Sequence, residues 1–129
     1  MDLFSKCRVG DLEGVRLSLE NGADINEKDN DIYARHALIY ASIYRRLEIA
    51  QLLLDNGADI NDKDNNGRTA LIYASRNGHL EIVQLLLSHD ADIYDTDKDG
   101  QTALTYAYRY EHLEIVELLN DSQSSYVLK

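Results

Sequence analysis

The sequence predicts an all-α solenoid of about four stacked repeats, each built from two helices and a hairpin-like loop. The first observation is a period of 33 residues, because ALIYAS at 37–42 recurs at 70–75 and returns as ALTYAY at 103–108. The second is the closeness of the copies, since 37–61 and 70–94 are identical at 16 of 25 positions. The third is physical. One such unit cannot bury its own apolar face, so neighbouring units must stack to form a continuous core.

The elements follow one another in the same order in every unit, and the third unit shows that order. A stretch rich in Asp, Asn and Gly at 62–68 is typical of a turn. Thr69 then precedes a short helix of small and apolar residues and is suited to cap it, as is Thr102 one unit later. After a break at Gly78, LEIVQLLL at 80–87 has the apolar spacing of a helix buried over much of its surface.

These motifs carry a resemblance to a known family. The patterns D-x-x-G-x-T-A-L, G-H-L-E-I-V-x-L-L-L and G-A-D-I-N resemble those of ankyrin repeats, and the resemblance covers essentially the whole chain. It implies a single ankyrin-repeat domain, 1–129, with repeats at about 1–26 (an N-terminal cap), 27–61, 62–94 and 95–129 (a C-terminal repeat and tail).

Several positions depart from the family's pattern. The usual Thr-Pro-Leu-His lacks its proline and its histidine in every copy, so we expect looser loops. Two extra residues between Asn26 and Ala37 predict a longer loop in the second repeat. Arg45 and Glu111 stand where Gly78 stands in the third repeat. Because glycine at that site supplies a left-handed backbone, both substitutions should cost stability.

The core and the two ends carry further expectations. Tyrosines recur every 33 residues in the first helices, and we expect them to stack as a ladder in the core: Tyr40, Tyr73 and Tyr106. Lys6 replaces the alanine of the other repeats, which indicates an N-terminal cap that faces water. The last helix keeps the apolar residues of an internal repeat, so we expect a partly exposed C-terminal face at Ile115, Leu118 and Leu119, covered by Tyr126, Val127 and Leu128 or by a second copy.

Composition and charge argue against several classes of function. The net charge of −10 counts against binding to nucleic acids or anionic membranes. No apolar run approaches the roughly 18 residues of a membrane span, and the N-terminus lacks the pattern of a secretory signal. Cys7 is the only cysteine, which favours a reducing, intracellular (cytoplasmic) location and a buried structural role for that residue.

The run DTDKDG at 95–100 begins like a calcium-binding EF-hand loop. The twelfth position of such a loop supplies a bidentate glutamate, but here it is Tyr106, and the same pattern one repeat earlier places Tyr73 there. The spacing is therefore better explained by turns rich in Asp and Gly. The histidines are scattered by the repeat, and no catalytic or phosphate-binding motif is present. We expect no metal site, no cofactor and no enzymatic activity.

The family resemblance implies a concave surface of loops and first helices that binds other proteins. Carried over position by position, the contact residues are Arg8, Ile32, Tyr33, Arg35, Ile43, Tyr44, Asn65, Asn66, Arg68, Arg76, Asn77, Lys98, Asp99, Arg109 and Tyr110, with Val9 and Gln101 beside them. Arginine and tyrosine dominate this set, and both are enriched among residues that carry binding energy. The hypothesis is a protein partner with acidic residues flanking an apolar one, centred on the second and third repeats.

Two alternatives from other classes stay open. The chain would be a monomer if both ends are capped, whereas an exposed C-terminal face would make it self-associate as a homodimer or a longer array. It would instead be a recruitment module if it belongs to a larger protein whose catalytic activity lies elsewhere.

Overall fold

The computed structural model describes the backbone of residues 1–128 and the side chains of residues 1–123. Over this range the chain forms eight α-helices and no strand. The helices follow one another as pairs: α1 (Leu3–Val9) and α2 (Leu12–Glu20), α3 (Ala37–Ile43) and α4 (Leu47–Asp55), α5 (Ala70–Asn77) and α6 (Leu80–Ser88), α7 (Ala103–Arg109) and α8 (Leu113–Leu128). The predicted all-α solenoid is confirmed.

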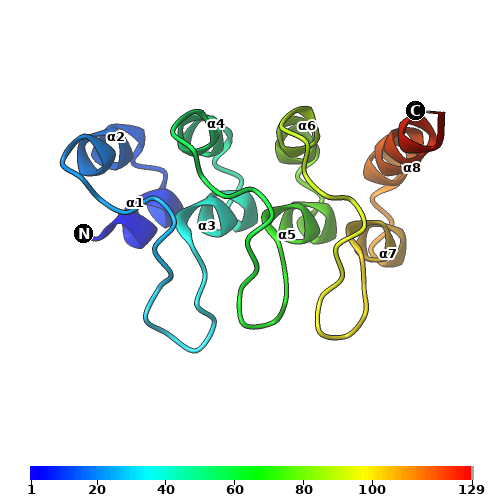
Figure 1. Ribbon diagram of the computed structural model, residues 1–129, viewed down its shortest axis with the longest axis horizontal. Coiled ribbons are helices and arrows are strands. Elements are labelled where there is room, and N and C mark those ends of the chain that lie inside the picture. The colour runs from blue at the N-terminus through cyan, green and yellow to red at the C-terminus, as the bar shows by residue number, and fades with distance from the viewer. Residues whose placement is uncertain (129) are drawn as a thin grey trace.

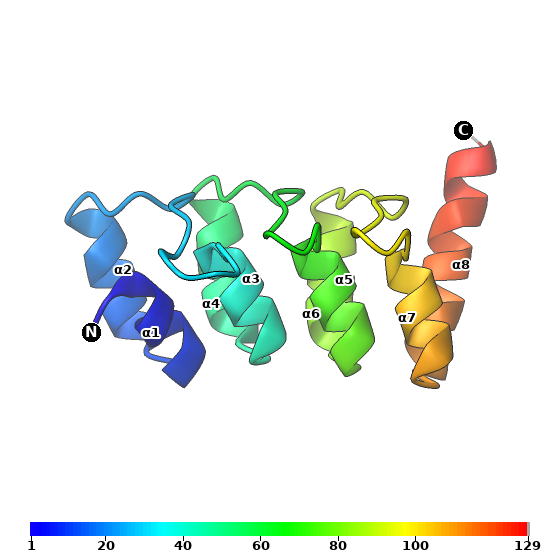
Figure 2. The same ribbon diagram turned by 90° about the horizontal axis from the view of Figure 1, so that it is seen from below.

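The helix pairs stand side by side in two rows (Figure 1). The first helices α1, α3, α5 and α7 form one row, and the second helices α2, α4, α6 and α8 form the other. Three long loops project from the row of first helices, on the side away from the second row. We call them the first finger (27–36), the second finger (62–69) and the third finger (95–102). Figure 2 shows the helices of neighbouring repeats side by side, with α8 extending beyond the ends of the others.

The core lies between successive helix pairs. Ala41, Ala74 and Ala107 are fully buried, and their small side chains let neighbouring first helices approach closely. Cys7 is also fully buried, and burial raises the pKa of its thiol to about 12, which makes it the inert structural cysteine that we expected. Larger apolar side chains fill the remaining space: Leu38, Ile39, Leu53, Leu71, Ile72, Ile82, Val83, Leu86, Ile115 and Leu119.

Helix starts differ between repeats. The Thr69 hydroxyl accepts a hydrogen bond from the Ile72 amide at 3.2 Å, and Thr102 accepts one from the Thr105 amide at 3.2 Å. The two predicted threonine caps are therefore confirmed. His36 occupies the same position before α3, but its side chain makes no capping hydrogen bond.

The turn between the two helices of a pair uses a left-handed residue. Gly78 has a φ of 75°, and Arg45 and Glu111 have φ values of 60° and 60° at the equivalent positions. The left-handed backbone at Arg45 and Glu111 is thus confirmed. Side chains with a Cβ are disfavoured in this region, so both residues hold it at some cost in free energy.

The residue after this turn links each repeat to the one before it. His79 Nε2 lies 3.0 Å from the Ile43 carbonyl oxygen, and His112 Nε2 lies 3.0 Å from that of Arg76. In the second repeat Arg46 takes this place, and its guanidinium donates two hydrogen bonds, at 3.1 and 2.9 Å, to the first repeat. Arginine and histidine thus bind the same kind of carbonyl group, one at the C-terminal end of the first helix in the preceding repeat, which has no partner within its own helix.

The first finger is longer, as predicted. A hydrogen bond from the Asp64 amide to the Arg68 carbonyl, at 3.0 Å, closes the base of the second finger. In the first finger the matching bond joins the Asp29 amide to the Arg35 carbonyl, at 2.8 Å, and so spans two more residues. Ala34 adopts a positive φ of 50° within this longer loop.

The ends of the stack depart from expectation at one point. The Lys6 ammonium donates to the Ser18 hydroxyl at 2.7 Å, a polar contact in place of a neighbouring repeat. At the other end, Ile115 and Leu119 are 2% and 1% exposed, so the expected partly exposed face was wrong for these two residues, whereas Leu118 is half-buried as expected. The chain covers them with its own helices, α7 included. Among the described residues of the last repeat, the exposed large apolar side chains are those of Tyr108, Tyr110 and Leu113. The side chains of Tyr126, Val127 and Leu128 lie outside the described residues.

Candidate interaction surface

Two buried carboxylates organise the second and third fingers. Asp64 and Asp97 are each 6% exposed. Asp64 Oδ1 accepts hydrogen bonds from the backbone amides of Asn66 and Arg68, at 2.9 and 3.0 Å. Asp97 makes the same two bonds with the amides two and four residues further on, at 3.0 and 3.0 Å. Side chains of this type fix tight turns, so the acidic pattern of DTDKDG belongs to the turn, as expected.

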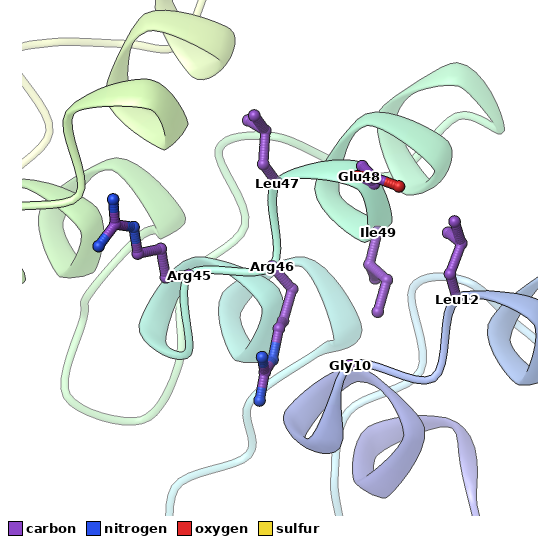
Figure 3. Close-up of a pocket in the computed structure, with 7 residues that line it drawn as sticks. All are labelled: Gly10, Leu12, Arg45, Arg46, Leu47, Glu48 and Ile49. Atoms are coloured by element: carbon purple, nitrogen blue, oxygen red, sulfur yellow. The ribbon is translucent and has the colours of Figure 1, made fainter.

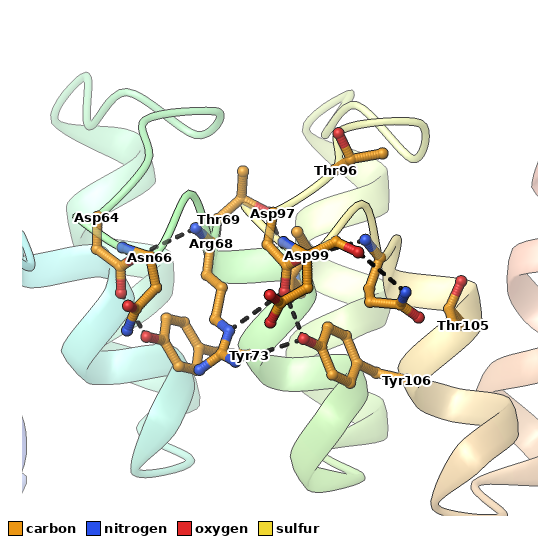
Figure 4. Close-up of polar contacts among 12 residues, drawn as sticks. Asp64, Asn66, Arg68, Thr69, Tyr73, Thr96, Asp97, Asp99, Thr105 and Tyr106 are labelled. Atoms are coloured by element: carbon orange, nitrogen blue, oxygen red, sulfur yellow. Dashed lines mark hydrogen bonds and ion pairs between the residues drawn. The ribbon is translucent and has the colours of Figure 1, made fainter.

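The second oxygen of each carboxylate accepts a hydrogen bond from a buried tyrosine. The Tyr73 hydroxyl donates to Asp64, and the Tyr106 hydroxyl donates to Asp97 (Figure 4). Burial raises the pKa of both tyrosines, and the hydrogen bonds to the carboxylates raise it further, so both hydroxyls stay protonated donors. Burial alone would raise the pKa of Asp97, but hydrogen bonds from Tyr106, from two backbone amides and from an arginine outweigh it and lower the pKa.

Arginines join each of these pairs to the preceding finger. Arg35 Nε lies 3.7 Å from Asp64 Oδ2, and its Nη2 donates to the Tyr73 hydroxyl at 3.3 Å. One repeat later, Arg68 reaches Asp97 and its tyrosine at 3.4 and 3.4 Å (Figure 4). The sequence assigns Arg35 and Arg68 to partner binding. The structure places most of each side chain inside the stack, with 20% and 19% of its surface exposed.

The tyrosines are therefore buried, as predicted, but they do not stack on one another. Tyr40, Tyr73 and Tyr106 are at most 3% exposed. The guanidinium carbon of Arg68 lies 5.7 Å from the ring centroids of both Tyr73 and Tyr106, so arginine separates successive rings. Tyr40 instead contacts the ring of Phe4, with the two ring centroids 5.8 Å apart. The ladder is polar and cationic, because only such partners can satisfy the buried hydroxyls and carboxylates.

Most predicted contact residues on the fingers and helix ends do face solvent. Ile32 is 77% exposed at the tip of the first finger, and Tyr33 beside it is 39% exposed. Tyr44 and Tyr110, at equivalent positions after the first helices, are 41% and 46% exposed. Ile43 is half-buried and packs against the core.

The finger tips are tied together. The Asn65 side chain and backbone amide donate to two carbonyls of the first finger, at 2.9 and 2.8 Å. The Lys98 amide donates to the Asn66 carbonyl at 3.1 Å, which joins the third finger to the second. The side chains of Lys98 and Asp99 are exposed. The fingers thus form one continuous edge.

Two arginines differ from Arg35 and Arg68. The guanidinium carbon of Arg76 lies 5.9 Å from the Tyr106 ring centroid and 5.8 Å from that of Tyr110. That of Arg109 lies 5.5 Å from the Tyr106 centroid, and Arg109 Nη2 donates to Gln101 Oε1 at 3.2 Å. Within the described part of the chain neither forms an ion pair, and Arg76 Nε is buried without a hydrogen-bond partner. Cationic groups over aromatic rings are held in place by the ring quadrupole.

We call the solvent-facing side chains of this region the inner surface. It consists of Arg8, Ile32, Tyr33, Ile43, Tyr44, Asn65, Asn66, Arg76, Asn77, Lys98, Asp99, Arg109 and Tyr110. Arg8 and Asn77 are exposed, and Arg8 donates to the Ser5 hydroxyl at 3.3 Å. Sequence reasoning missed Tyr106 as the residue that gathers the arginines. Its period of 33 residues, shared with the arginines before and after it, was the signal that could have revealed it.

Shallow hollows occur elsewhere, near the turns within the helix pairs. One of about 300 Å³ is lined by Gly10, Leu12, Arg45, Arg46, Leu47, Glu48 and Ile49 (Figure 3). Another of about 350 Å³ is lined by residues at the equivalent positions of the third and fourth repeats: Gly78, Leu80, Glu111, His112, Leu113, Glu114 and Ile115. Because the hollow recurs with the repeat, it is a consequence of how the helix pairs stack.

Stacked helix pairs with projecting fingers define a helical-repeat protein with an extended surface for binding. No group of three or more His, Cys, Asp or Glu side chains among the described residues is placed to hold a metal ion. Of the described helices, none has the length and apolar character needed to cross a membrane.

A comparison with protein families identifies the family of helical-repeat proteins to which the chain belongs. A model of ankyrin repeats in three copies matches residues 3–97 and 63–128. The chain therefore belongs to the ankyrin repeat family, as its motifs predicted. Ankyrin repeats generally act as modules that bind other proteins and are typically not catalytic. No curated protein matches the chain.

Proposed function

We propose that this chain is a non-catalytic interaction module that binds a segment of another protein through its inner surface. The segment carries acidic residues beside an apolar one. The observation that supports this most is the exposure of Tyr33, Tyr44 and Tyr110, between 39% and 46%, on the face that also holds arginines without ion pairs. Tyrosine and arginine carry a disproportionate share of binding energy when a partner buries them.

Charge supports an acidic partner. The chain has a net charge of −10, which repels acidic proteins at long range. Arg8, Arg76 and Arg109 nevertheless stand on the inner surface, and among the described residues none of them is paired with a carboxylate. A local positive region on an acidic protein favours one orientation of an acidic partner over others.

A pair of double variants tests the proposal. Arg76→Glu with Tyr44→Ala changes the inner surface, and Arg16→Glu with Leu17→Ala makes a matched change on α2. Tyr44 and Leu17 have similar exposure, 41% and 47%, and the Arg16 side chain next to Leu17 is 46% exposed and, within the described residues, pairs only with the exposed Glu13 of its own helix. Random peptides displayed on phage are selected against the whole chain, and the affinities of the selected peptides are measured for all three proteins.

The inner-surface variant should weaken binding by about 100-fold, because two residues of the kind that dominate interfaces are lost. The α2 variant should bind within about twofold of the wild type, since exposed residues away from an interface contribute little. Circular dichroism of both variants checks that the helices are intact. Equal loss in the two variants, or no loss in either, would contradict the proposal.

Self-association through the C-terminal end is the second candidate. Tyr108 and Leu113 are 65% and 68% exposed there. Tyr108 occupies the position of Ser42 and Ser75, which are fully buried in repeats that have a neighbour on that side. A second copy stacked in the same register would have to accommodate a tyrosine where a serine fits, which is unfavourable in a close-packed interface. Light scattering at several protein concentrations separates the candidates, because a monomer keeps its mass.

A further inference from the structure

The arginines near the inner surface fall into two groups. Arg35 and Arg68 are bound to the buried carboxylates of the next repeat. Arg76 and Arg109 occupy equivalent positions one repeat apart, and within the described residues neither has an anionic partner. The sequence could not separate the groups, because all four are arginines close to the fingers or the helix ends.

Arg76 and Arg109 converge on one aromatic side chain. With Arg68, they place three guanidinium groups between 5.5 and 5.9 Å from the centroid of Tyr106. The carboxylate in contact with this group is Asp97, which already accepts from Arg68 and Tyr106. The cluster of Arg76, Arg109, Tyr106 and Tyr110, which we call the cationic corner, therefore has positive charge that the described chain does not neutralise.

The cationic corner is also ordered in advance. Arg76 contacts two rings, and Arg109 contacts one ring and the Gln101 amide oxygen. A guanidinium that is already positioned loses little side-chain entropy when an anion binds. Its planar group of donors matches a carboxylate, which accepts two parallel hydrogen bonds from it.

The inner surface is apolar at α3. Ile43 stands at the position of Arg76 and Arg109 in the second repeat, and Tyr44 follows it, 41% exposed. In the first repeat Arg8 takes the position of Ile43, and Val9 after it is 53% exposed. Along the last three repeats the inner surface thus changes from apolar at α3 to cationic at α5 and α7.

The spacing of packed helices sets the distance between the two halves. Neighbouring first helices pack about 8–10 Å apart, so α3 and the point between α5 and α7 are separated by about 12–15 Å. An extended chain rises about 3.3 Å per residue, so this distance corresponds to about four residues. These distances apply to a partner segment that is extended and lies across the first helices.

We propose that the partner segment is extended, places an apolar residue against Ile43 and Tyr44, and places an aspartate or glutamate about four residues away in the cationic corner. This inference rests on the proposed function and adds to it the location, the order and the spacing of the two anchors. It also moves the acidic anchor from the centre of the stack to the junction of the third and fourth repeats.

The test uses peptides selected by phage display against the whole chain, followed by synthetic versions of the strongest binder. Three changes are made to that peptide: the acidic residue is replaced by its amide, the acidic residue is moved two positions closer, and an acidic residue outside the spacing is replaced by its amide as a control. Affinities are measured by fluorescence anisotropy for the wild type, Arg76→Gln and Arg109→Gln.

The selected peptides should share an acidic residue about four positions from an apolar one. Replacing or moving that residue should weaken binding to the wild type by about tenfold, as expected when one partner of a partly desolvated charge pair is removed. The control replacement should change affinity by less than about twofold. Against Arg76→Gln or Arg109→Gln the same peptide changes should have a much smaller effect.

Peptides that depend on the inner surface but show no acidic residue at this spacing would overturn the inference and leave the proposed function standing. A phosphorylated peptide that binds the cationic corner while its carboxylate analogue does not would also overturn it. If no selected peptide depends on the inner surface, the proposed function and the inference both fail.

Discussion

The second and third repeats build the same pair of helices with different polar residues. Thr69 caps the first helix of the third repeat, whereas His36 stands in its place in the second and makes no capping bond. Gly78 supplies the left-handed turn in one repeat, and Arg45 is held in the same conformation, with a φ of 60°, in the other. The apolar faces therefore determine the helices, while the polar residues determine how much stability each repeat contributes.

The fingers of these repeats show the same contrast. In the second finger Asp64 alone accepts hydrogen bonds from two backbone amides and a tyrosine, and it forms an ion pair with Arg35. In the longer first finger the backbone amides bond to Asp31, at 2.9 and 3.0 Å, and Asp29 accepts from the Tyr40 hydroxyl at 2.6 Å. In the first finger Asp29 and Asp31 thus share the contacts that Asp64 makes alone in the second finger. Each of the two should therefore contribute less to the free energy of unfolding than Asp64 does.

The largest expected effect follows from this contrast. Asp64→Ala should lower the free energy of unfolding by about 2–4 kcal/mol, because it leaves a buried hydroxyl and a half-buried guanidinium without their acceptor. Asp29→Ala should cost less, about 1–2 kcal/mol, because the half-buried Asp29 is the acceptor of one hydroxyl, that of Tyr40, and forms no ion pair among the described residues. Urea unfolding followed by circular dichroism measures both. Equal losses would show that the two fingers are held in the same way.

The turn between helices gives the next effect. Gly78→Ala should destabilise by about 1–2 kcal/mol, because a Cβ is disfavoured in the left-handed region. The new Cβ would also lie 2.6 Å from His112 Cε1. Arg45→Gly should have the opposite sign and stabilise by up to about 1 kcal/mol. Thermal unfolding of the two variants tests the pair, and a loss of stability in Arg45→Gly would refute the account of this turn.

The smallest effect concerns the helix cap. His36→Thr should change the free energy of unfolding by less than about 1 kcal/mol at neutral pH, because the restored cap is offset by the loss of a fully buried imidazole and its contact with the Asp62 carbonyl. The stability of the variant relative to the wild type should increase in acid. Burial lowers the pKa of His36 below its ordinary value of 6.5, so below that pH the unfolded chain takes up a proton that the folded chain does not. The wild type therefore loses stability as the pH falls through 6.5 toward the folded pKa.

Unfolding of the wild type and His36→Thr between pH 7.5 and pH 5 measures that difference. His36→Gln serves as a control that removes the titration without restoring a strong cap. A constant difference between the wild type and both variants across this range would contradict the role given to His36.

The helices, caps and turns of this protein could be predicted well from its sequence. Regular spacing of apolar residues predicted the helix pairs, and the residue types at Thr69, Arg45 and Glu111 predicted a cap and two left-handed turns. Each of these is a local feature, controlled by one residue and its neighbours in the chain. The longer first finger was predicted for the same reason, from two inserted residues before Ala37.

The network of aspartate, tyrosine and arginine was not predicted, because it joins residues about one repeat apart. Arg68 contacts Tyr106, which lies 38 residues further along the chain. Tyr106 was expected to pack in the core, and its burial was confirmed, but its hydroxyl required an acceptor that the periodicity alone does not identify. The exposed arginines could be separated from the buried ones only when the carboxylates that bind Arg35 and Arg68 were located in space.

The difference between Arg35 and Arg76 tests the central claim most directly. Arg35→Gln and Arg76→Gln are compared in two measurements, the melting temperature and the affinity for the strongest selected acidic peptide. Arg35→Gln should lower Tm by several degrees, about 2–8 °C per kcal/mol lost, and change the affinity by less than about twofold. Arg76→Gln should lower the affinity for the peptide by about tenfold with little change in Tm. The reverse result, with Arg35 needed for binding and Arg76 for stability, would contradict the assignment of the binding surface.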